Sequence, residues 1–141
     1  MTITITDDAR RYIALFEDVT GATARDCLIE DDGERLVFVV TRGEMATAIG
    51  PGGETVRRLE VRVGKDVQLV EDAETPEAFV ANALSPAAVY NVTISENEST
   101  IAYVEVDEND LGVAIGRNGR NIALARRLAE RHFDVDDVEL A

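Results

Sequence analysis

The feature of this sequence that most restricts its fold is an internal repeat. The segment AIG at residues 48–50 recurs at residues 114–116, which is 66 positions later, and in both copies a glycine follows three residues after the last of these. A repeat of this length indicates two copies of a small domain, because solenoid repeats are usually shorter. We therefore predict two modules, 1–74 and 75–141, each with a thin core. The alternative is one α/β domain whose halves resemble each other by chance.

Each half predicts the same order of elements: helix, strand, strand, short helix, loop, helix, strand. The signals are helical spacing of apolar residues, alternation in the strands, and capping residues or glycine at helix ends. The first half predicts a helix at 7–16, strands at 22–30 and 35–41, a short helix ending at residue 49, a helix at 54–63 and a strand at 66–71. The second half predicts a helix at 76–84, strands at 88–95 and 100–106, a short helix after residue 107, a helix ending near residue 131 and a strand at 135–140. The fold class is α/β (α+β), with a three-stranded sheet packed by helices in each module.

The composition is strongly acidic. Asp and Glu number 28 against 14 Lys and Arg, and the formal net charge is −14. By itself this charge argues against a nucleic-acid partner. However, Lys65 is the only lysine, and an acid-rich, lysine-poor surface is typical of adaptation to high salt. Because the Debye length in molar salt is only about 3 Å, distant carboxylates barely repel a phosphate chain. The local distribution of charge therefore matters more than the total.

Cysteine and histidine are nearly absent, which excludes several kinds of site. Cys27 and His132 are the only residues of these types, so we expect no internal disulfide, no zinc site of ordinary ligand number and no Ser–His or Cys–His nucleophile pair. The sequence accordingly predicts no enzyme, no cofactor and no metal. No apolar run is long enough to span a membrane and no signal peptide is present, so we expect a cytoplasmic protein.

Each half contains a Gly-x-x-Gly loop between two predicted helices. The first glycine loop is Gly50-Pro51-Gly52-Gly53, and the second glycine loop is Gly116-Arg117-Asn118-Gly119. Glycines let the backbone turn sharply and remove the Cβ atoms that would hold a ligand away. The helix that follows directs its first N–H groups and the positive end of its dipole at the loop, which suits a phosphate. One isolated copy would be better interpreted as a helix–helix turn, but two copies in matched surroundings favour an anion site.

Other phosphate motifs do not fit these loops. No Lys-Ser or Lys-Thr pair follows the last glycine, as a Walker A motif requires. Neither loop follows a strand directly, as a dinucleotide-binding loop does. The sequence therefore gives no support to a nucleotide cofactor.

Basic side chains gather beside the loops. In the second half every arginine lies on the second glycine loop or in the helix after it, and Arg120 and Arg127 share a helical face. In the first half Arg58, Arg62 and Lys65 are spaced to form a similar stripe. The alternative is a solvated helix face with no ligand, on which arginines near the helix C-terminus interact favourably with the helix dipole. Two basic regions on an acidic chain, each next to a glycine loop, favour a binding role.

Aromatic residues are too scarce for a base-stacking platform, with four Phe, three Tyr and no Trp. Ile49 and Ile115 directly precede their loops and either offer aliphatic surface to a base or belong to the core. The candidate binding residues are Ile49, Gly50, Pro51, Gly52, Gly53, Arg58, Arg62, Ile115, Gly116, Arg117, Asn118, Gly119, Arg120 and Arg127.

The segments IGPGG and IGRNGRNI, each between two helices with flanking strands, resemble KH domains of the type II (prokaryotic) order. The run LGVAIGRNGRNIALARRLAERHFDV is similar to the second KH domain of the NusA family. The tandem pair covers essentially the whole chain and resembles the short archaeal-type members of that family. Bacterial members carry a polymerase-binding domain and an S1 domain before the KH pair, and this sequence shows neither.

The resemblance implies binding of single-stranded RNA, with about four nucleotides held per domain and the backbone clamped at Gly-x-x-Gly. The implied process is transcription elongation, termination or antitermination, with RNA polymerase or the ribosome as further candidate partners. We expect no membrane and no small-molecule substrate. The first glycine loop has Pro51-Gly52 where KH loops often carry a basic residue, so the second is expected to bind more strongly. The alternative function is a protein-docking module for RNA polymerase or the ribosome with little direct RNA binding.

Overall fold

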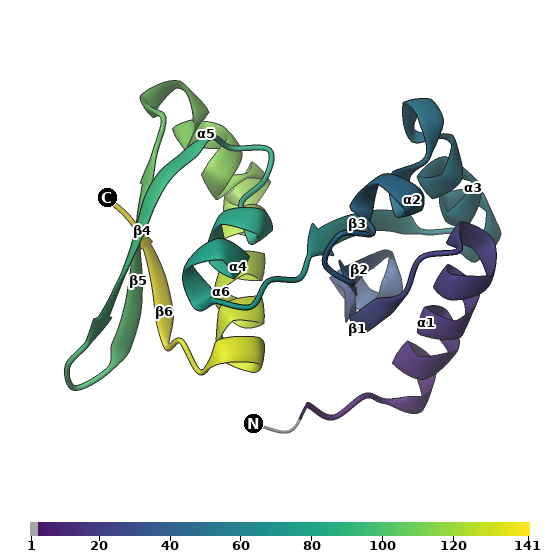
Figure 1. Ribbon diagram of the computed structural model, residues 1–141, viewed down its shortest axis with the longest axis horizontal. Coiled ribbons are helices and arrows are strands. Elements are labelled where there is room, and N and C mark those ends of the chain that lie inside the picture. Colours follow the sequence, from purple (N-terminus) through teal and green to yellow (C-terminus); the bar gives the residue numbers. More distant parts are fainter. Residues whose placement is uncertain (1–2) are drawn as a thin grey trace. The chain divides into compact units, whose positions relative to one another are not determined.

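The computed structural model describes residues 3–141, which form two compact units. We call residues 4–72 the N-terminal module and residues 73–141 the C-terminal module. In each, helices cover one face of a three-stranded sheet (Figure 1). The predicted division into domains 1–74 and 75–141 stays a prediction. Within residues 3–141, no helix is long and apolar enough to cross a membrane.

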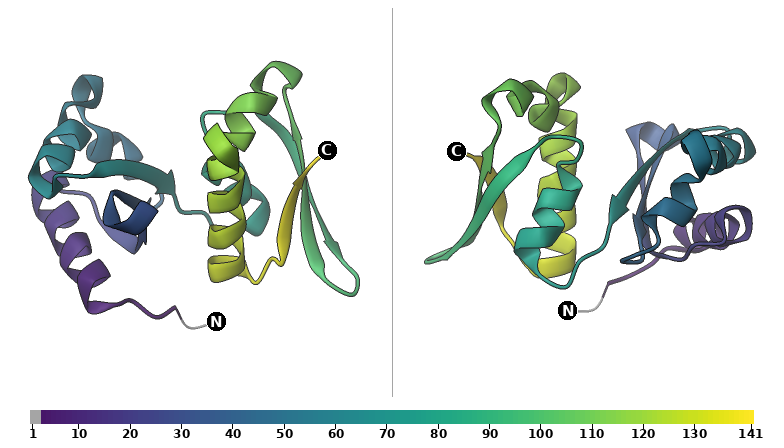
Figure 2. Two further views of the ribbon diagram at one scale, coloured as in Figure 1. Left: turned by 180° about the vertical axis from the view of Figure 1, so that it is seen from behind. Right: turned by 45° about the horizontal axis from the view of Figure 1, so that its top comes forward.

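The N-terminal module has the predicted order of elements. They are α1 (Asp7–Thr20), β1 (Ala24–Glu30), β2 (Arg35–Val40), α2 (Met45–Ile49), α3 (Glu54–Val63) and β3 (Asp66–Glu71), with short 3₁₀ turns at Asp31–Gly33 and Pro51–Gly53. β2 is the central strand: it pairs antiparallel with β1 and parallel with β3, so that Phe38 lies opposite Cys27 on one side and Leu69 on the other. The views in Figure 2 show α1 and α3 on the same side of this sheet.

Helix α1 is one turn longer than its predicted span of 7–16. Thr6 caps its start by accepting a hydrogen bond from the Ala9 amide at 3.1 Å. The last turn is held because Thr20 Oγ1 donates to the Phe16 carbonyl at 2.7 Å, and Gly21 ends the helix in a left-handed conformation with φ 77°. The glycine cap therefore determines where the helix ends. The prediction placed the end too early because the helical spacing of apolar residues is clear only as far as Phe16.

The core of the N-terminal module lies between the sheet and its helices. Phe16 of α1 stacks on Phe38 of β2 with ring centroids 4.7 Å apart, and Leu59 of α3 is fully buried in the same cluster. Cys27 is only 4% exposed, and burial, together with the neighbouring Asp26 carboxylate, raises the pKa of its thiol to about 12. Cys27 is thus a small core side chain rather than a reactive thiol.

The C-terminal module repeats this arrangement. Its elements are α4 (Pro76–Ala83), β4 (Val89–Glu96), β5 (Thr100–Val106), α5 (Leu111–Ile115), α6 (Arg120–Phe133) and β6 (Asp137–Leu140), with 3₁₀ turns at Glu108–Asp110 and Arg117–Gly119. β5 is central, antiparallel to β4 and parallel to β6. Phe79 of α4 packs on His132 and Phe133 of α6, with centroids 5.3 and 5.2 Å away. The final strand begins two residues later than predicted, because Asp134 ends α6 in a left-handed conformation.

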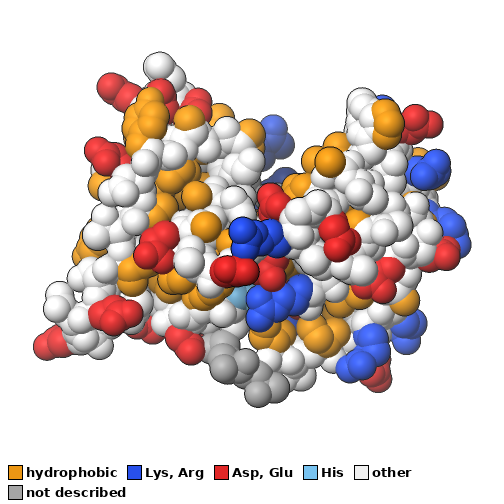
Figure 3. All heavy atoms as spheres, in the orientation of Figure 1, with side chains coloured by type: hydrophobic (Ala, Val, Ile, Leu, Met, Phe, Trp, Pro, Cys, Tyr) orange, Lys and Arg blue, Asp and Glu red, His pale blue; other side chains and the backbone are white. Residues whose placement is uncertain are grey.

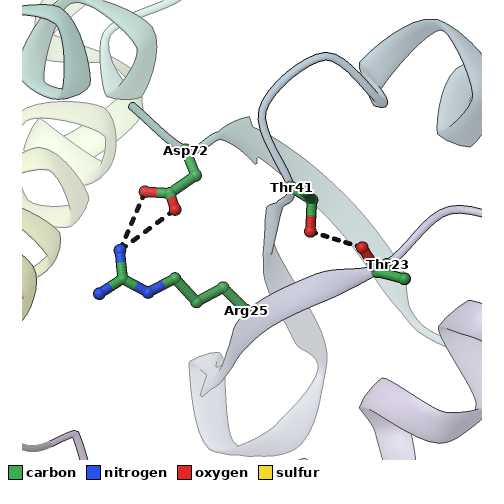
Figure 4. A network of polar contacts seen from close by, with 4 residues as sticks. All are labelled: Thr23, Arg25, Thr41 and Asp72. Atoms are coloured by element: carbon green, nitrogen blue, oxygen red, sulfur yellow. Dashed lines mark hydrogen bonds and ion pairs between the residues drawn. The ribbon is translucent and has the colours of Figure 1, made fainter. Parts of the chain in front are cut away.

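Polar contacts hold the strand ends of the N-terminal module together (Figure 4). The hydroxyl groups of Thr23 and Thr41 lie 2.5 Å apart, which joins the start of β1 to the residue after β2. Arg25 of β1 donates to both carboxylate oxygens of Asp72, at 3.1 and 3.3 Å, just beyond β3. All three strands are therefore fixed at the end from which the chain continues into α2.

A carboxylate just before each short helix ties that helix to the sheet. Glu44, which precedes α2, accepts a hydrogen bond from the Thr23 amide at 2.7 Å. Asp110, which precedes α5 and lies 66 residues after Glu44, accepts one from the Ala88 amide at 2.8 Å. Both modules thus use the same device to position the helix that leads into the glycine loop.

Two residues on α3 provide a matched test of this packing. Leu59 is 0% exposed and Val61 is 84% exposed. We expect Leu59→Ala to lower the free energy of unfolding of the N-terminal module by about 2–5 kcal/mol, because it leaves a cavity. We expect Val61→Ala to change it by less than about 0.5 kcal/mol. Chemical denaturation at one fixed high salt concentration measures both, and equal losses in the two variants would contradict the packing of α3.

Candidate nucleic-acid interface

The two glycine loops have the same backbone conformation. Gly50 and Gly116 have φ/ψ of 74°/171° and 78°/172°, Gly52 and Asn118 have 59°/21° and 57°/27°, and Gly53 and Gly119 have 77°/13° and 73°/16°. In both loops the amide of the last glycine donates to the carbonyl of the first, at 3.0 and 3.1 Å. The sequence repeat is therefore a repeat of geometry: at these three pairs of positions no angle differs by more than 6° between the loops.

The first glycine of each loop has no room for a side chain. A Cβ atom at Gly50 would lie 2.0 Å from Thr55 Oγ1 and 2.9 Å from the Thr55 amide nitrogen. A Cβ atom at Gly116 would lie 2.8 Å from Asn121 Cγ and 2.9 Å from its amide nitrogen. The following helix, α3 or α6, therefore packs directly against the first glycine. This close approach brings the start of the helix next to the loop.

The middle of each loop faces solvent. Pro51 and Gly52 are exposed, as are Arg117 and Asn118, while the flanking glycines are half-buried. Among the residues that the structure describes, no side chain caps α3 or α6 at Gly53 or Gly119. Each loop thus presents an uncapped, positively polarised helix start next to an open surface, which is an arrangement that binds anions.

The second loop has a brace that the sequence reasoning missed. The Asn121 side-chain amide donates to the Val113 carbonyl at 2.8 Å, which joins the first turn of α6 to α5 across the loop. In the first loop Thr55 occupies the equivalent position against Gly50. The spacing Gly-x-x-Gly-x-Asn was visible in the sequence, but the partner of the Asn side chain follows only from the close packing of the two helices.

Apolar side chains lie exposed beside both loops. Ile49 is 37% exposed and Ile115 is 39% exposed, so neither of these predicted contacts is fully buried. On α5, Leu111 and Val113 are also about two-fifths exposed, at 39% and 41%. Sequence reasoning did not select these two, although a short helix that is apolar on nearly every side was the available signal. The second loop therefore adjoins a larger aliphatic surface than the first.

The arginines among the candidate binding residues all lie on the exposed surface of α3, α6 or the second glycine loop. Arg58 and Arg62 lie on α3, Arg117 lies in the loop, and Arg120 and Arg127 lie on α6. Figure 3 shows some Lys and Arg side chains at the edge of the visible face where α3 lies, while others lie elsewhere on that face and Asp and Glu are scattered among them.

In the predicted stripe of Arg58, Arg62 and Lys65, the last member lies beyond the end of α3 and makes a contact within the module. The Lys65 ammonium group donates to the carbonyl of Gly33, which lies between β1 and β2. Lys65 is therefore engaged in joining β3 to that turn. Arg126, next to the predicted Arg127, is engaged as well, since its Nε lies 3.0 Å from the Val138 carbonyl and 2.9 Å from Asp137 Oδ1.

A tyrosine–aspartate pair lies where α5 begins. The Tyr90 hydroxyl donates to Asp107 Oδ2, and the Asn109 amide donates to Asp107 Oδ1 at 2.8 Å. The hydrogen bond from Tyr90 is the main cause that lowers the pKa of the Asp107 carboxyl, and the same bond raises the pKa of Tyr90. The stability that this pair contributes is fully present between the ordinary pKa of Asp107 and that of Tyr90. It is lost as the pH falls through the lowered pKa of Asp107 or rises through the raised pKa of Tyr90.

The close packing at Gly50 gives a direct test. We expect Gly50→Ala to lower the free energy of unfolding of the N-terminal module by at least about 2 kcal/mol, because the new Cβ would overlap Thr55 and the backbone angles there are nearly exclusive to glycine. The control is Gly52→Asn, which places in the first loop the residue that the second loop carries at the same backbone angles. We expect it to change stability by less than about 0.5 kcal/mol. Denaturant unfolding distinguishes the two, and a neutral Gly50→Ala would rule out this packing.

Comparisons with known proteins agree with this architecture. The profile of the NusA-like second KH domain matches residues 76–141, and a KH domain profile matches residues 10–80. A crystal structure of the protein designated APE1850 is 33% identical in sequence, superposes with a TM-score of 0.84, and covers 97% of this chain and 100% of its own. The fold is accordingly a tandem of two KH domains.

The proteins with similar sequences described below all have NusA in their names. A protein of Halococcus morrhuae named as a probable transcription termination protein NusA is 64% identical over 141 residues, which is 100% of both chains. One from Halobacterium salinarum with the same name is 61% identical over 140 residues, or 99% of both. The transcription termination/antitermination protein NusA of Mycobacterium bovis is 38% identical over 88 residues, 62% of this chain but 25% of that protein. The two relatives that are more than 60% identical come from halophiles, in agreement with the salt-adapted composition. The chain belongs to the NusA family of transcription termination proteins.

Proposed function

We propose that this protein binds single-stranded RNA with both KH domains during transcription elongation, termination or antitermination. The observation that carries the proposal is the repeated loop: two exposed Gly-x-x-Gly turns with matching backbone angles, each leading into a helix without a side-chain cap. A single turn of this kind has a purely structural explanation. Retention of the same turn in two modules, with different residues in its exposed middle, is better explained by a shared ligand.

The loop chemistry suits the sugar-phosphate backbone. The start of α3 or α6 supplies backbone N–H donors and a partial positive charge, which favour a phosphate over a neutral group. The absence of a Cβ atom at Gly52 and at Gly119, where no other atom would lie within 4 Å of it, leaves open space for the RNA backbone. Bases that extend away from the clamped phosphates would meet the aliphatic side chains of Ile49 or Ile115, in accord with a site of about four nucleotides per KH domain.

The net charge of −14 does not conflict with this function. In molar salt the Debye length is about 3 Å, so carboxylates elsewhere on the surface are screened from a bound phosphate. Only groups that touch the RNA then influence its affinity. Beside the second loop these groups include Arg117 and Arg120, which are both exposed.

The second loop is the stronger site in this proposal. It carries Arg117 where the first loop has Pro51, and α6 begins with Arg120 where α3 begins with Glu54. The exposed Leu111 side chain adds aliphatic surface beside it. Charge-assisted contacts from arginine are stronger than neutral ones. The two domains would therefore bind RNA with unequal strength.

The proposal is tested by placing a carboxylate in each loop. We expect Asn118→Asp to weaken binding of a mixed-sequence single-stranded RNA about tenfold and Gly52→Asp about threefold, because each sets a like charge against a phosphate. The matched controls are Asn118→Gly and Gly52→Asn, which exchange the residues of the two loops without adding charge. RNA titration by fluorescence anisotropy at high salt measures all four, and circular dichroism verifies that each variant is folded.

The same titration separates the proposal from its alternative. If both carboxylate variants remain folded and bind RNA as the wild type does, the phosphate-clamp function is wrong. A protein-docking role on RNA polymerase or the ribosome would then be the better interpretation. A wild-type protein with no measurable affinity for RNA would lead to the same conclusion.

A further inference from the structure

The first glycine loop lacks the basic residues that lie in and next to the second glycine loop. Its backbone matches the second loop, yet it has Pro51 where the second has Arg117, and its helix begins with Glu54 where the other begins with Arg120. If both loops bind phosphate, the first does so without a basic residue in the loop and with a carboxylate nearby. Another cationic side chain of the N-terminal module would then have to supply the positive charge that the first loop lacks.

Arg57 lies in the position to do this. A Cβ atom built on Gly53 would lie 3.0 Å from Arg57 Nη1 and 3.8 Å from Arg57 Cζ, so the guanidinium group rests against the last glycine of the first loop. The geometry has a simple cause: Arg57 is four residues after Gly53, and helical side chains lean toward the helix N-terminus. The glycine leaves the space that the guanidinium group occupies.

The second loop has no such neighbour. A Cβ atom on Gly119 would have nothing within 4 Å among the described atoms, and the residue 66 positions after Arg57 is Ala123. Both modules thus place an arginine against the loop, but by different routes. In the second it is part of the loop, and in the first it reaches the loop from the following helix turn.

The Arg57 guanidinium is available to a ligand. Arg57 is exposed, and its guanidinium group has no hydrogen bond or ion pair with any of residues 3–141. By contrast, Arg25 is held by Asp72, and Arg126 is held by Asp137. The planar guanidinium group offers paired N–H donors that match two oxygens of a phosphate.

We propose that Arg57 is the cationic phosphate contact of the first glycine loop and supplies there the charge that Arg117 supplies in the second. The inference rests on the proposed RNA-binding function. The ligand is the RNA sugar-phosphate backbone, clamped between the start of α3 and the Arg57 side chain. Sequence comparison of the two loops alone misses this contact, because the arginine lies outside the Gly-x-x-Gly segment.

The experiment isolates the first loop by using the full-length chain with Asn118→Asp as background, which weakens the second loop. The probe is a labelled mixed-sequence RNA of about 12 nucleotides, enough for two sites of about four nucleotides each. Arg57→Gln removes the charge and keeps most of the side-chain length. Arg11→Gln is the matched control, because it removes an equal charge from an exposed arginine on α1 of the same module.

We expect Arg57→Gln to weaken binding about threefold to tenfold, as for an exposed charge-assisted contact in salt. We expect it also to reduce the slope of log affinity against log salt by about 0.7, the value for one phosphate of a single strand. Arg11→Gln should leave both quantities unchanged. Adding Pro51→Arg to Arg57→Gln places an arginine where the second loop has one, and it should restore affinity and slope.

Three outcomes decide the matter. Loss of affinity that Pro51→Arg restores supports the proposal. If Arg57→Gln binds like Arg11→Gln while Gly52→Asp still weakens binding, the Arg57 contact is wrong and the RNA-binding function stands. If Arg57→Gln lowers the free energy of unfolding and Pro51→Arg restores nothing, Arg57 has a structural role and the proposal is overturned. Failure of the function itself would show separately, as absence of RNA binding by the wild type.

Discussion

The close contact between a glycine and the first turn of the following helix is the constraint on which each candidate site depends. At Gly50 and Gly116 the backbone takes φ/ψ of 74°/171° and 78°/172°, a region that is nearly exclusive to glycine. Thr55 and Asn121 press against these glycines at distances that leave no room for a Cβ atom. This packing brings the start of α3 or α6 to the loop, so the positive end of the helix dipole is presented at an exposed turn.

The sheet makes this contact rigid. Glu44 and Asp110 accept hydrogen bonds from the chain at the start of the first strand of their modules, and each stands directly before its short helix. The central strand of each sheet pairs on both sides, antiparallel with one neighbour and parallel with the other. A helix attached to such a strand has little freedom to move, and a preformed loop loses less conformational entropy when it binds a ligand.

The two modules share a backbone but differ in the side chains around the loop. The second loop has an Asn121 brace, two nearby arginines and an aliphatic surface on α5, whereas the first has Pro51, Glu54 and an arginine that approaches from α3. Since high salt screens distant charge within about 3 Å, such local differences outweigh the overall acidity. Duplication followed by divergence of side chains gives two sites of related geometry and unequal electrostatics.

Features that depend on residues close together along the chain could be predicted from the amino-acid sequence. It correctly predicted the bounds of α3 and β3, the order of elements in both modules and the two glycine loops, because capping, alternation and turn formation involve residues a few positions apart. Other contacts became visible only in the three-dimensional structure. Lys65 donates a hydrogen bond to the carbonyl of Gly33, and Asn121 donates one to α5. The register in which the parallel strands pair is a third such feature. These contacts join atoms from separate elements, and their geometry depends on how whole helices and strands pack, which no short-range pattern specifies.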